Sequence, residues 1–403
     1  MHRYLFCTAL VLAACSQGAD SGTGPDVQAA ADASYQETLQ LALLDAQPGE
    51  VITIPAGTHR LDRGLSLTAD GVTIRGEGMD ASVLSFADQI AGAEGLLVTG
   101  DDVVLENFAV EDAKGDAIKI SDTDGVTIRG VRVEWTGEPR TENGAYGLYP
   151  VQTSNVLIED VVAIGASDAG IYVGQSKGVI VRNSRAERNV AGIEIENTQD
   201  ADVYGNVATD NTGGILVFNM PGLTQPGARV RVFDNDIYEN DRGNFGHPGT
   251  PVASIPAGSG VVVNSHDDIE IFANRIRDNR TANIIIASVY SSNFADTSWS
   301  DTFDPYPDRI HVHSNDLSGG GDKPDGMELK AAKTMKFGLT GRFPHVLWDG
   351  FVRGEDDPQI CVEEPEAEVF NADLPGESKN MRVDMAMHRC TLPRLPEVTL
   401  REG

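Results

Sequence analysis

The stretch "GIYVGQSKGVIVRNSRAERNVAGIEIENTQDADVYGNVATDNTGGILVF", residues 170–218, repeats one short unit. Each unit contains brief apolar runs, rich in β-branched residues, with apolar side chains at alternate positions. Such alternation is typical of strands rather than helices. An asparagine block recurs with a spacing of 23 residues from Asn183 to Asn206, and longer steps contain extra loop residues. The lead asparagines of the five blocks are Asn183, Asn206, Asn235, Asn274 and Asn315.

A unit of this size cannot bury its apolar face alone, so a regular period of this length indicates a solenoid. Asparagines at the same turn of successive coils can stack, each amide bonding to the next. Glycine and asparagine also tolerate the left-handed backbone of tight corners. The sequence therefore predicts an all-β fold, a single-stranded right-handed parallel β-helix over residues 34–339 including an N-terminal capping helix. The alternative is a β-sandwich of unrelated strands, which has no need of in-register asparagines.

The N-terminal segment has the features of an export signal. His2 and Arg3 precede an apolar run that is too short to span a bilayer as a stable anchor. The run ends in "LAAC" at Cys15, which resembles the lipobox of bacterial lipoproteins. That resemblance implies removal of residues 1–14 as a lipoprotein signal peptide and lipidation of Cys15. With Ser16 next in the chain, it implies an outer-membrane lipoprotein on the periplasmic or cell-surface side. An ordinary secretory signal peptide is the alternative.

Both ends of the predicted solenoid differ from the repeat. Residues 15–33 are small and polar, which favours a flexible tether. A capping box from Ser34 to Glu37 opens a predicted helix that ends at Pro48 and would cover the edge of the first coil. Residues 340–403 lose the repeat and are predicted to form a C-terminal cap or tail. Cys361 and Cys390 are the cysteines that remain after export, and we expect a disulfide between them.

The formal net charge of −30 limits the choice of partners. A chain with no basic patch lacks the electrostatic footprint of a nucleic-acid-binding protein. The charge favours solubility and attraction of cations, and it repels polyanions at long range. A neutral glycan or a protein partner is therefore favoured over an acidic glycan without Ca²⁺.

Aligning the second strand of each coil on its inward apolar residue predicts a shared outer surface. The alignment ends with Met327 as the last inward residue, and outward side chains alternate with the inward ones. Four insertions, residues 136–145, 219–228, 241–259 and 290–308, flank this strand set and are predicted to wall a groove. The outward residues of the early coils are Lys119, Tyr149, Tyr172 and Glu194. Glu196 belongs to a second outward column, two residues further along its strand. Asp116 and Tyr146 stand two residues before the inward residue of their strands.

The repeat region resembles the right-handed parallel β-helix proteins of the pectin-lyase-like superfamily. Its segment "NGAYGLYPVQTSN", residues 143–155, is distantly similar to mannuronan C5-epimerases, whose Tyr-Gly-Phe-Asp-Pro-His run is matched at Tyr146-Gly147 and at Pro150. "KGDA" at 114–117 roughly matches the upstream Lys-x-Asp-Gly of that family. Tyr149 and Val151 replace the family's aspartate and histidine.

The resemblance implies uronate chemistry, in which a carboxylate is neutralised and a proton is removed from and returned to C5. Lys114 or Lys119 would neutralise the carboxylate, and Tyr146 would act as acid or base. The remaining surface residues would bind substrate. These are Asp116, Tyr149, Tyr172, Glu194 and Glu196. Because the family's histidine is absent, the family mechanism does not transfer unchanged. Plain solvated surface residues are the alternative.

Two groups of residues bear on metal binding. Glu194 and Glu196 share a face and could bind Ca²⁺ with neighbouring carboxylates. His311 and His313 lie on one face of a predicted strand, but no third ligand follows at a clear spacing, so we predict no metal site there. Two functions remain open. One is a lipid-anchored protein that binds a polysaccharide, with lyase or C5-epimerase activity on it, and the other is a non-catalytic, NosD-like scaffold for a protein partner.

Overall fold

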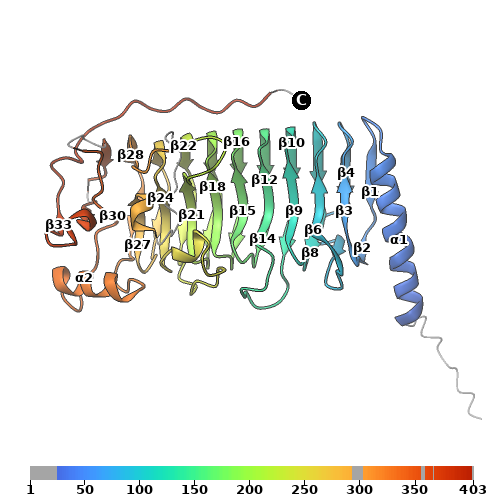
Figure 1. Ribbon diagram of the computed structural model, residues 1–403, viewed down its shortest axis with the longest axis horizontal. Helices are drawn as coiled ribbons and strands as arrows, with labels where there is room; N and C mark the ends of the chain where they lie inside the picture. The colour runs from blue at the N-terminus through green and yellow to red at the C-terminus, as the bar shows by residue number, and fades with distance from the viewer. Residues whose placement is uncertain (1–24, 293–302, 355–358, 366, 402–403) are drawn as a thin grey trace, which may run out of the picture.

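The described residues form an elongated solenoid with three long parallel sheets of 11, 10 and 12 strands (Figure 1). The computed structural model describes residues 25–292, 303–354, 359–365 and 367–401. Each coil contributes one strand to each sheet, and each strand pairs with the equivalent strand of the next coil. The predicted single-stranded parallel β-helix is therefore confirmed.

We call the three sheets sheet 1, sheet 2 and sheet 3. Sheet 1 contains β1 (Val51–Ile54), β4 (Thr73–Gly76), β7 (Val103–Glu106), β10 (Asp124–Arg129), β13 (Ser154–Glu159), β16 (Lys177–Arg182), β19 (Gln199–Tyr204), β22 (Ala228–Phe233), β25 (Asp267–Phe272), β28 (Ile310–His313) and β31 (Ile360–Glu363). Sheet 2 contains β2 (Gly57–Arg60), β5 (Ser82–Ser85), β8 (Ala109–Glu111), β11 (Arg132–Glu134), β14 (Val162–Ile164), β17 (Arg185–Glu187), β20 (Val207–Thr209), β23 (Asp236–Tyr238), β26 (Arg275–Arg277) and β29 (Asp316–Ser318).

Sheet 3 contains β3 (Arg63–Leu67), β6 (Ala91–Val98), β9 (Asp116–Ser121), β12 (Tyr146–Val151), β15 (Ala169–Gly174), β18 (Ala191–Glu196), β21 (Gly213–Phe218), β24 (Ser259–Asn264), β27 (Ala282–Ala287), β30 (Val346–Trp348), β32 (Val369–Asn371) and β33 (Arg382–Val383). Its last pair, β32 with β33, is antiparallel. Two α-helices and three short 3₁₀ helices complete the described elements, namely α1 (Pro25–Asp45), α2 (Met327–Phe337), η1 (Val252–Ser254), η2 (Val289–Ser291) and η3 (Leu374–Gly376).

The core is a column of aliphatic side chains inside the coils. On β18, for example, Ile193 and Ile195 are fully buried. The predicted inward column is in register from coil to coil, with Ile193 opposite Ile171 on one side and Ile215 on the other. Because apolar side chains at alternate positions all point inward, the short β-branched runs of the sequence become a continuous core.

Two ladders of buried asparagines join successive coils. In one ladder the amide of Asn206 donates to Asn235 (3.0 Å) and the amide of Asn235 donates to Asn274 (2.9 Å). The amide of Asn274 in turn donates to Asn315 (3.0 Å). A second ladder links Asn189, Asn211, Asn240 and Asn279 at the next corner. Each amide also donates to a backbone carbonyl, as Asn235 does to Val203 (2.9 Å), so the corners are saturated with hydrogen bonds.

The first lead asparagine does not belong to this ladder. Asn206 accepts a hydrogen bond from the backbone of Ser184, so Ser184, and not Asn183, holds the ladder position in its coil. Asn183 is exposed and has a φ of 51°. Gly205, at the equivalent corner of the next coil, has a φ of 66°. Asparagine and glycine both adopt this left-handed conformation. An asparagine therefore occurs at the left-handed corner position as well as at the adjacent ladder position, and the sequence alignment placed Asn183 one residue away from the ladder.

The capping helix begins earlier than predicted. Helix α1 starts at Pro25 rather than at Ser34, so residues 25–33, expected to belong to the tether, have a helical backbone. Ser34 lies inside the helix, where its carbonyl accepts a hydrogen bond from the Thr38 hydroxyl (2.8 Å). Alanine-rich sequence before Ser34 favours helix, and Pro25 suits a first helical position. Leu39 and Leu43 of α1 are buried against the first coils.

The prediction that Met327 is the last inward residue of the aligned strands is wrong. Met327 opens α2 and is 87% exposed. Val346 of β30 takes its expected place opposite Ile284. The segment "MELKAAKTMKF" is rich in strong helix formers, which outweigh the approximate repeat spacing. The solenoid also continues beyond residue 339, because β30, β31 and β32 extend sheets 1 and 3.

After the last strands the chain turns back along sheet 1 (Figure 1). We call residues 391–401 the C-terminal strap. The disulfide between Cys361 on β31 and Cys390 lies immediately before it. Backbone N–H groups of the strap then donate to Glu270 from Leu395 (3.1 Å) and to Asp202 from Val398 (3.1 Å). The strap thus runs from the last coils back to β10 and β7, where Arg401 pairs with Asp124 (2.7 Å) and Asp102.

Residues 1–14 and Cys15, for which export and lipidation were expected, lie outside the described residues. No helix in the described ranges is long and apolar enough to cross a membrane.

We predict that Asn235→Ala lowers the free energy of unfolding by about 1–3 kcal/mol, since it leaves buried ladder groups without partners. Urea unfolding followed by circular dichroism measures the change. Asn183→Gly is the matched control, since the exposed corner accepts glycine, and its midpoint should stay near that of the wild type. Equal losses in the two variants would contradict a structural role for the ladder.

Candidate functional site

The predicted outer column of sheet 3 is in register. Lys119 on β9 lies opposite Tyr149 on β12, and Tyr172 on β15 lies opposite Glu194 on β18. The rings of Tyr149 and Tyr172 bridge the two pairs with their centroids 5.0 Å apart. The coils therefore place these four side chains as neighbours on one face.

Three tyrosines form the centre of this face, and we call Tyr146, Tyr149 and Tyr172 the tyrosine cluster. The centroid of Tyr146 lies 4.5 Å from that of Tyr149 and 4.6 Å from that of Tyr172. Tyr146 and Tyr149 are partly exposed, whereas Tyr172 is buried. Neighbouring rings at these separations contribute favourable contacts beyond simple burial. The result is a rigid aromatic surface with two accessible rings.

Four carboxyl groups surround the tyrosines, and we call Asp116, Asp168, Glu194 and Glu196 the carboxyl cluster. Glu196 accepts a hydrogen bond of 2.7 Å from the hydroxyl of Tyr172. Asp116 accepts one of 3.3 Å from the backbone N–H of Tyr146. Asp168 and Glu194 are 8% and 2% exposed. Glu194 points out of the sheet as predicted, but its neighbours exclude solvent from it.

Asp168 was missed by the sequence reasoning. It stands directly before β15, in the corner that precedes the outward column, so strand alternation does not mark it. Burial and the negative charges of Glu196 and Asp116 raise its pKa well above the usual range. Burial and the charges of Asp168 and Glu196 likewise raise the pKa of Glu194. Asp168 directly precedes Ala169, the residue in register with Tyr146, and this adjacency was the available signal.

The two more accessible carboxyl groups have pKa values near neutrality. Burial raises the pKa of Glu196 to about 7, although the hydrogen bond from Tyr172 opposes the shift. Burial also raises the pKa of Asp116 to about 6, against the backbone hydrogen bond of Tyr146 and the charge of Lys119. Carboxyl groups in this range can hold a proton and release it near neutral pH, which is what acid–base catalysis requires.

The phenols remain protonated. Burial, followed by the charges of Asp168, Glu194 and Glu196, raises the pKa of Tyr146 far above its ordinary value. Burial also raises the pKa of Tyr149 to about 12. Tyr146 is therefore suited to donate a hydrogen bond or a proton. The expected role as a base would require a phenolate that this acidic environment opposes.

The two candidate lysines are placed differently. The Nζ atom of Lys119 lies 3.6 Å from Glu94 Oε1 and 5.3 Å from the ring centroid of Tyr149, so its charge is shared with a carboxylate at the edge of the tyrosine cluster. Lys114 lies on the turn before β9 with an exposed side chain, and its backbone N–H donates to Gln89 (2.9 Å). The structure brings Lys119 into the site and leaves Lys114 on the adjacent turn.

One insertion lies on the sheet rather than beside it. Val252 and Ile255, from the insertion at 241–259, are buried together with Leu216 and Val262 of the middle strands. This packing closes the central part of the outer face. The accessible part is therefore limited to the early coils, where Lys119, Tyr146 and Tyr149 lie.

A calcium site among these carboxyl groups is not supported by the geometry. Within the described ranges, three potential metal ligands come within 4.8 Å of one another in two other places, Glu270–His311–His313 and Asp267–Asp304–Asp308. The first group contains the two histidines for which the sequence indicates no third ligand. Their third potential ligand, Glu270, comes from the neighbouring coil.

Comparison with known proteins agrees with the fold. A family model described as "Right handed beta helix region" matches residues 94–249, in agreement with the parallel solenoid of the described residues. A search of curated proteins finds no match.

Three solved structures that resemble the chain share 20% identity or less with it. The A-module of mannuronan C-5 epimerase AlgE4 from Azotobacter vinelandii is 20% identical with a TM-score of 0.47, covering 72% of this chain and 85% of that one. The alginate lyase from Paenibacillus sp. str. FPU-7 is 15% identical with a TM-score of 0.36, covering 71% and 96%. Pectate lyase Pel9A is 14% identical with a TM-score of 0.45, covering 81% and 86%.

We predict that Glu196→Gln reduces the pH dependence of stability. A carboxyl whose pKa is higher in the folded chain binds more protons folded than unfolded, so its contribution to the free energy of unfolding falls as the pH rises from 4.5 to about 7. Glutamine cannot titrate, and the fall in melting temperature across this window should be smaller in the variant. Glu142→Gln, at an exposed carboxyl, should leave the wild-type profile unchanged. Identical profiles for Glu196→Gln and the wild type would contradict the assigned shift.

Proposed function

We propose that this protein binds an uncharged polysaccharide on the outer face of sheet 3 and acts on it by acid–base chemistry. The observation that carries the proposal is the tyrosine cluster packed against the carboxyl cluster on adjacent coils. Aromatic faces suit the apolar faces of sugar rings, and carboxyl groups accept hydrogen bonds from sugar hydroxyls. Because the strands are fixed by pairing on both sides, the site is preorganised.

The charge of the site favours an uncharged glycan over a uronate. Lys119 lies at the edge of the tyrosine cluster, and its charge already faces Glu94 at 3.6 Å. Four carboxyl groups stand around the tyrosines, so a substrate carboxylate would meet repulsion from each group that is ionised. The chain's net charge of −30 acts in the same direction at long range. These charges weigh against the expected lyase or epimerase chemistry.

Glu196 is the best candidate for a proton donor. Its pKa of about 7 keeps a substantial fraction protonated at neutral pH, and its hydrogen bond to Tyr172 fixes its orientation. Asp116, with a pKa of about 6, is the second titrating carboxyl and lies at the accessible end. Cleavage of a glycosidic bond requires a protonated carboxyl group that gives its proton to the leaving oxygen, which is the state that Glu196 supplies. We therefore assign Glu196 as the acid and Tyr149 as the stacking platform, while Asp116, three strands away on β9, would bind substrate.

We expect Tyr149→Ala to weaken glycan binding by about tenfold, the loss expected for one aromatic contact of about 1–1.5 kcal/mol. Calorimetry with a panel of neutral glycans, alginate and pectate identifies the ligand. Tyr238→Ala, on sheet 2 and away from the cluster, should bind as the wild type does. Equal loss in both variants would place binding elsewhere.

Glu196→Gln should retain binding and lose turnover of the glycan found in this way, measured as new reducing ends. Unsaturated products from alginate or pectate, detected by ultraviolet absorbance, would instead support a lyase and overturn the preference for an uncharged substrate.

We also propose that Cys15 anchors the protein to the outer membrane through lipid, on the basis of the "LAAC" sequence at its cleavage position. Cys15→Ser should move the protein from the membrane fraction to the soluble fraction and abolish incorporation of labelled fatty acid. Membrane association that persists without label would contradict lipidation.

A further inference from the structure

A second group of chemically reactive side chains lies on the outer face of sheet 1. Glu270 on β25 and His311 on β28 occupy equivalent positions on neighbouring strands. His313 lies two residues further along β28, on the same face as His311 because side chains alternate. We call these three residues the histidine–glutamate cluster. One potential ligand atom of each residue lies within 4.8 Å of those of the other two.

The C-terminal strap removes this cluster from solvent. Glu270 is 2% exposed, and His311 and His313 are each 5% exposed, although all three side chains point away from the core. The backbone N–H of Leu395 in the strap donates to Glu270 Oε2 (3.1 Å). The cluster is therefore enclosed between sheet 1 and the strap.

Neighbouring groups orient the possible ligands. The Nε2 atom of His313 lies 2.9 Å from Glu270 Oε1, while its Nδ1 atom lies 3.1 Å from the Ser314 hydroxyl. The imidazole of His313 is thus held by one nitrogen and presents the other to Glu270. Outer hydrogen bonds of this type, and the one from Leu395 to Glu270, are typical supports of metal ligands.

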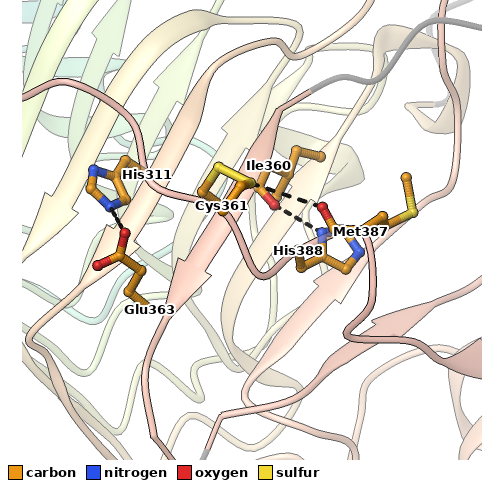
Figure 2. Close-up of a disulfide and its surroundings, with 7 residues drawn as sticks. His311, Ile360, Cys361, Glu363, Met387 and His388 are labelled. Carbon is orange, nitrogen blue, oxygen red and sulfur yellow. Dashed lines mark hydrogen bonds and ion pairs between the residues drawn. A yellow bond between two sulfur atoms is a disulfide. The ribbon is translucent and has the colours of Figure 1, made fainter.

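His311 adds a buried nitrogen whose hydrogen bonding is incomplete. Its Nε2 atom lies 3.3 Å from Glu363 Oε1 on β31 (Figure 2). Its Nδ1 atom is buried and has no hydrogen-bond partner among the described residues. The ring centroid of His311 lies 4.4 Å from that of His313, so the two imidazoles face one small volume. A buried polar atom without a partner is costly unless something else satisfies it.

The donor set indicates the kind of ion. Two imidazoles and one carboxylate are ligands for Zn²⁺ and related divalent transition metals, whereas Ca²⁺ and Mg²⁺ prefer oxygen ligands alone. Each bond to such an ion is about 2.1 Å long, so two ligand atoms on one ion lie at most about 4.2 Å apart. The three ligand atoms lie within 4.8 Å of one another, so the side chains would have to move together by a fraction of an ångström to bind one ion.

We propose that Glu270, His311 and His313 bind one divalent transition-metal ion of the Zn²⁺ class beneath the C-terminal strap. Glu363, which lies 3.3 Å from His311 Nε2, would orient that imidazole from outside the group of three ligands. The disulfide of Cys361, which lies opposite His311 on the next strand, holds the start of the same strap (Figure 2). The ion would fix the carboxylate of Glu270, which accepts from Leu395 of the strap, and so support the contact that holds the strap on sheet 1. This site is on sheet 1 and is independent of the glycan surface on sheet 3.

The test uses the purified protein after removal of metal with a chelator. Calorimetric titration with Zn²⁺ should show one site per chain, and Co²⁺ should give the visible absorption of an ion bound by nitrogen and oxygen ligands. Zn²⁺ should also raise the melting temperature. His311→Ala and His313→Ala should each abolish the single site and the Co²⁺ spectrum. His247→Ala, which removes an exposed histidine outside the cluster, should bind as the wild type does.

Glu270→Gln separates metal binding from folding. Glutamine keeps the side-chain shape and an oxygen that can accept from Leu395, so without metal the variant should keep the circular dichroism of the wild type. It should bind Zn²⁺ more weakly and lose part of the Zn²⁺-dependent rise in melting temperature. The proposal is overturned by the absence of one-site binding in the wild type. It is equally overturned if the affinity of the two histidine variants is unchanged, which would mean that the ion occupies other acidic groups on the surface.

Discussion

The register between successive coils is the constraint on which the rest of this structure depends. Parallel pairing places each residue beside its equivalent one coil away, and the ladder from Asn206 to Asn315 holds that register at the corner. A slip of one residue would turn Ile193 and its neighbours out of the core and break every ladder bond at once. Stability and site geometry therefore share one origin, since the same register that stacks the core also stacks the outer columns.

Both candidate sites are built across coils rather than within one. On sheet 3, Tyr146 and Tyr149 from one coil meet Tyr172 from the next, and Glu196 lies one coil further. On sheet 1, Glu270 meets His311 in the same manner. A solenoid lets such residues be far apart in sequence while their strands are adjacent. Burial then changes their chemistry, because a carboxyl group among other carboxyl groups and aromatic rings holds its proton more tightly.

The outer faces of the two sheets are covered by different means. Sheet 3 is covered at its centre by aliphatic residues of an insertion, Val252 and Ile255, and remains accessible at the early coils. Sheet 1 is covered by the C-terminal strap, whose backbone N–H groups satisfy carboxylates such as Asp202 and Glu270. Buried charges on sheet 1 are thereby paired, as Asp202 also is with Arg231 at 3.2 Å. The strap gives that face a polar interior in which metal ligands can be enclosed.

The sequence by itself determined the solenoid, its parallel strands and the column of Lys119, Tyr149, Tyr172 and Glu194. The alternation of apolar residues and the residue types at the corners are local signals, and because they repeat in every coil they can be recognised in the sequence. Similar corner residues at adjacent positions misplaced Asn183 by one residue, and approximate spacing misplaced Met327.

Only the tertiary structure decided which polar residues are buried and which come together. Asp168 lies at a corner outside the alternation, and Glu270 is separated from His311 by a long insertion that hides their register. The return of the strap over sheet 1 has no periodic signal, since it depends on hydrogen bonds between residues as distant as Val398 and Asp202. Burial, and the pKa values that follow from it, come from the sum of such distant contacts, which no local pattern encodes.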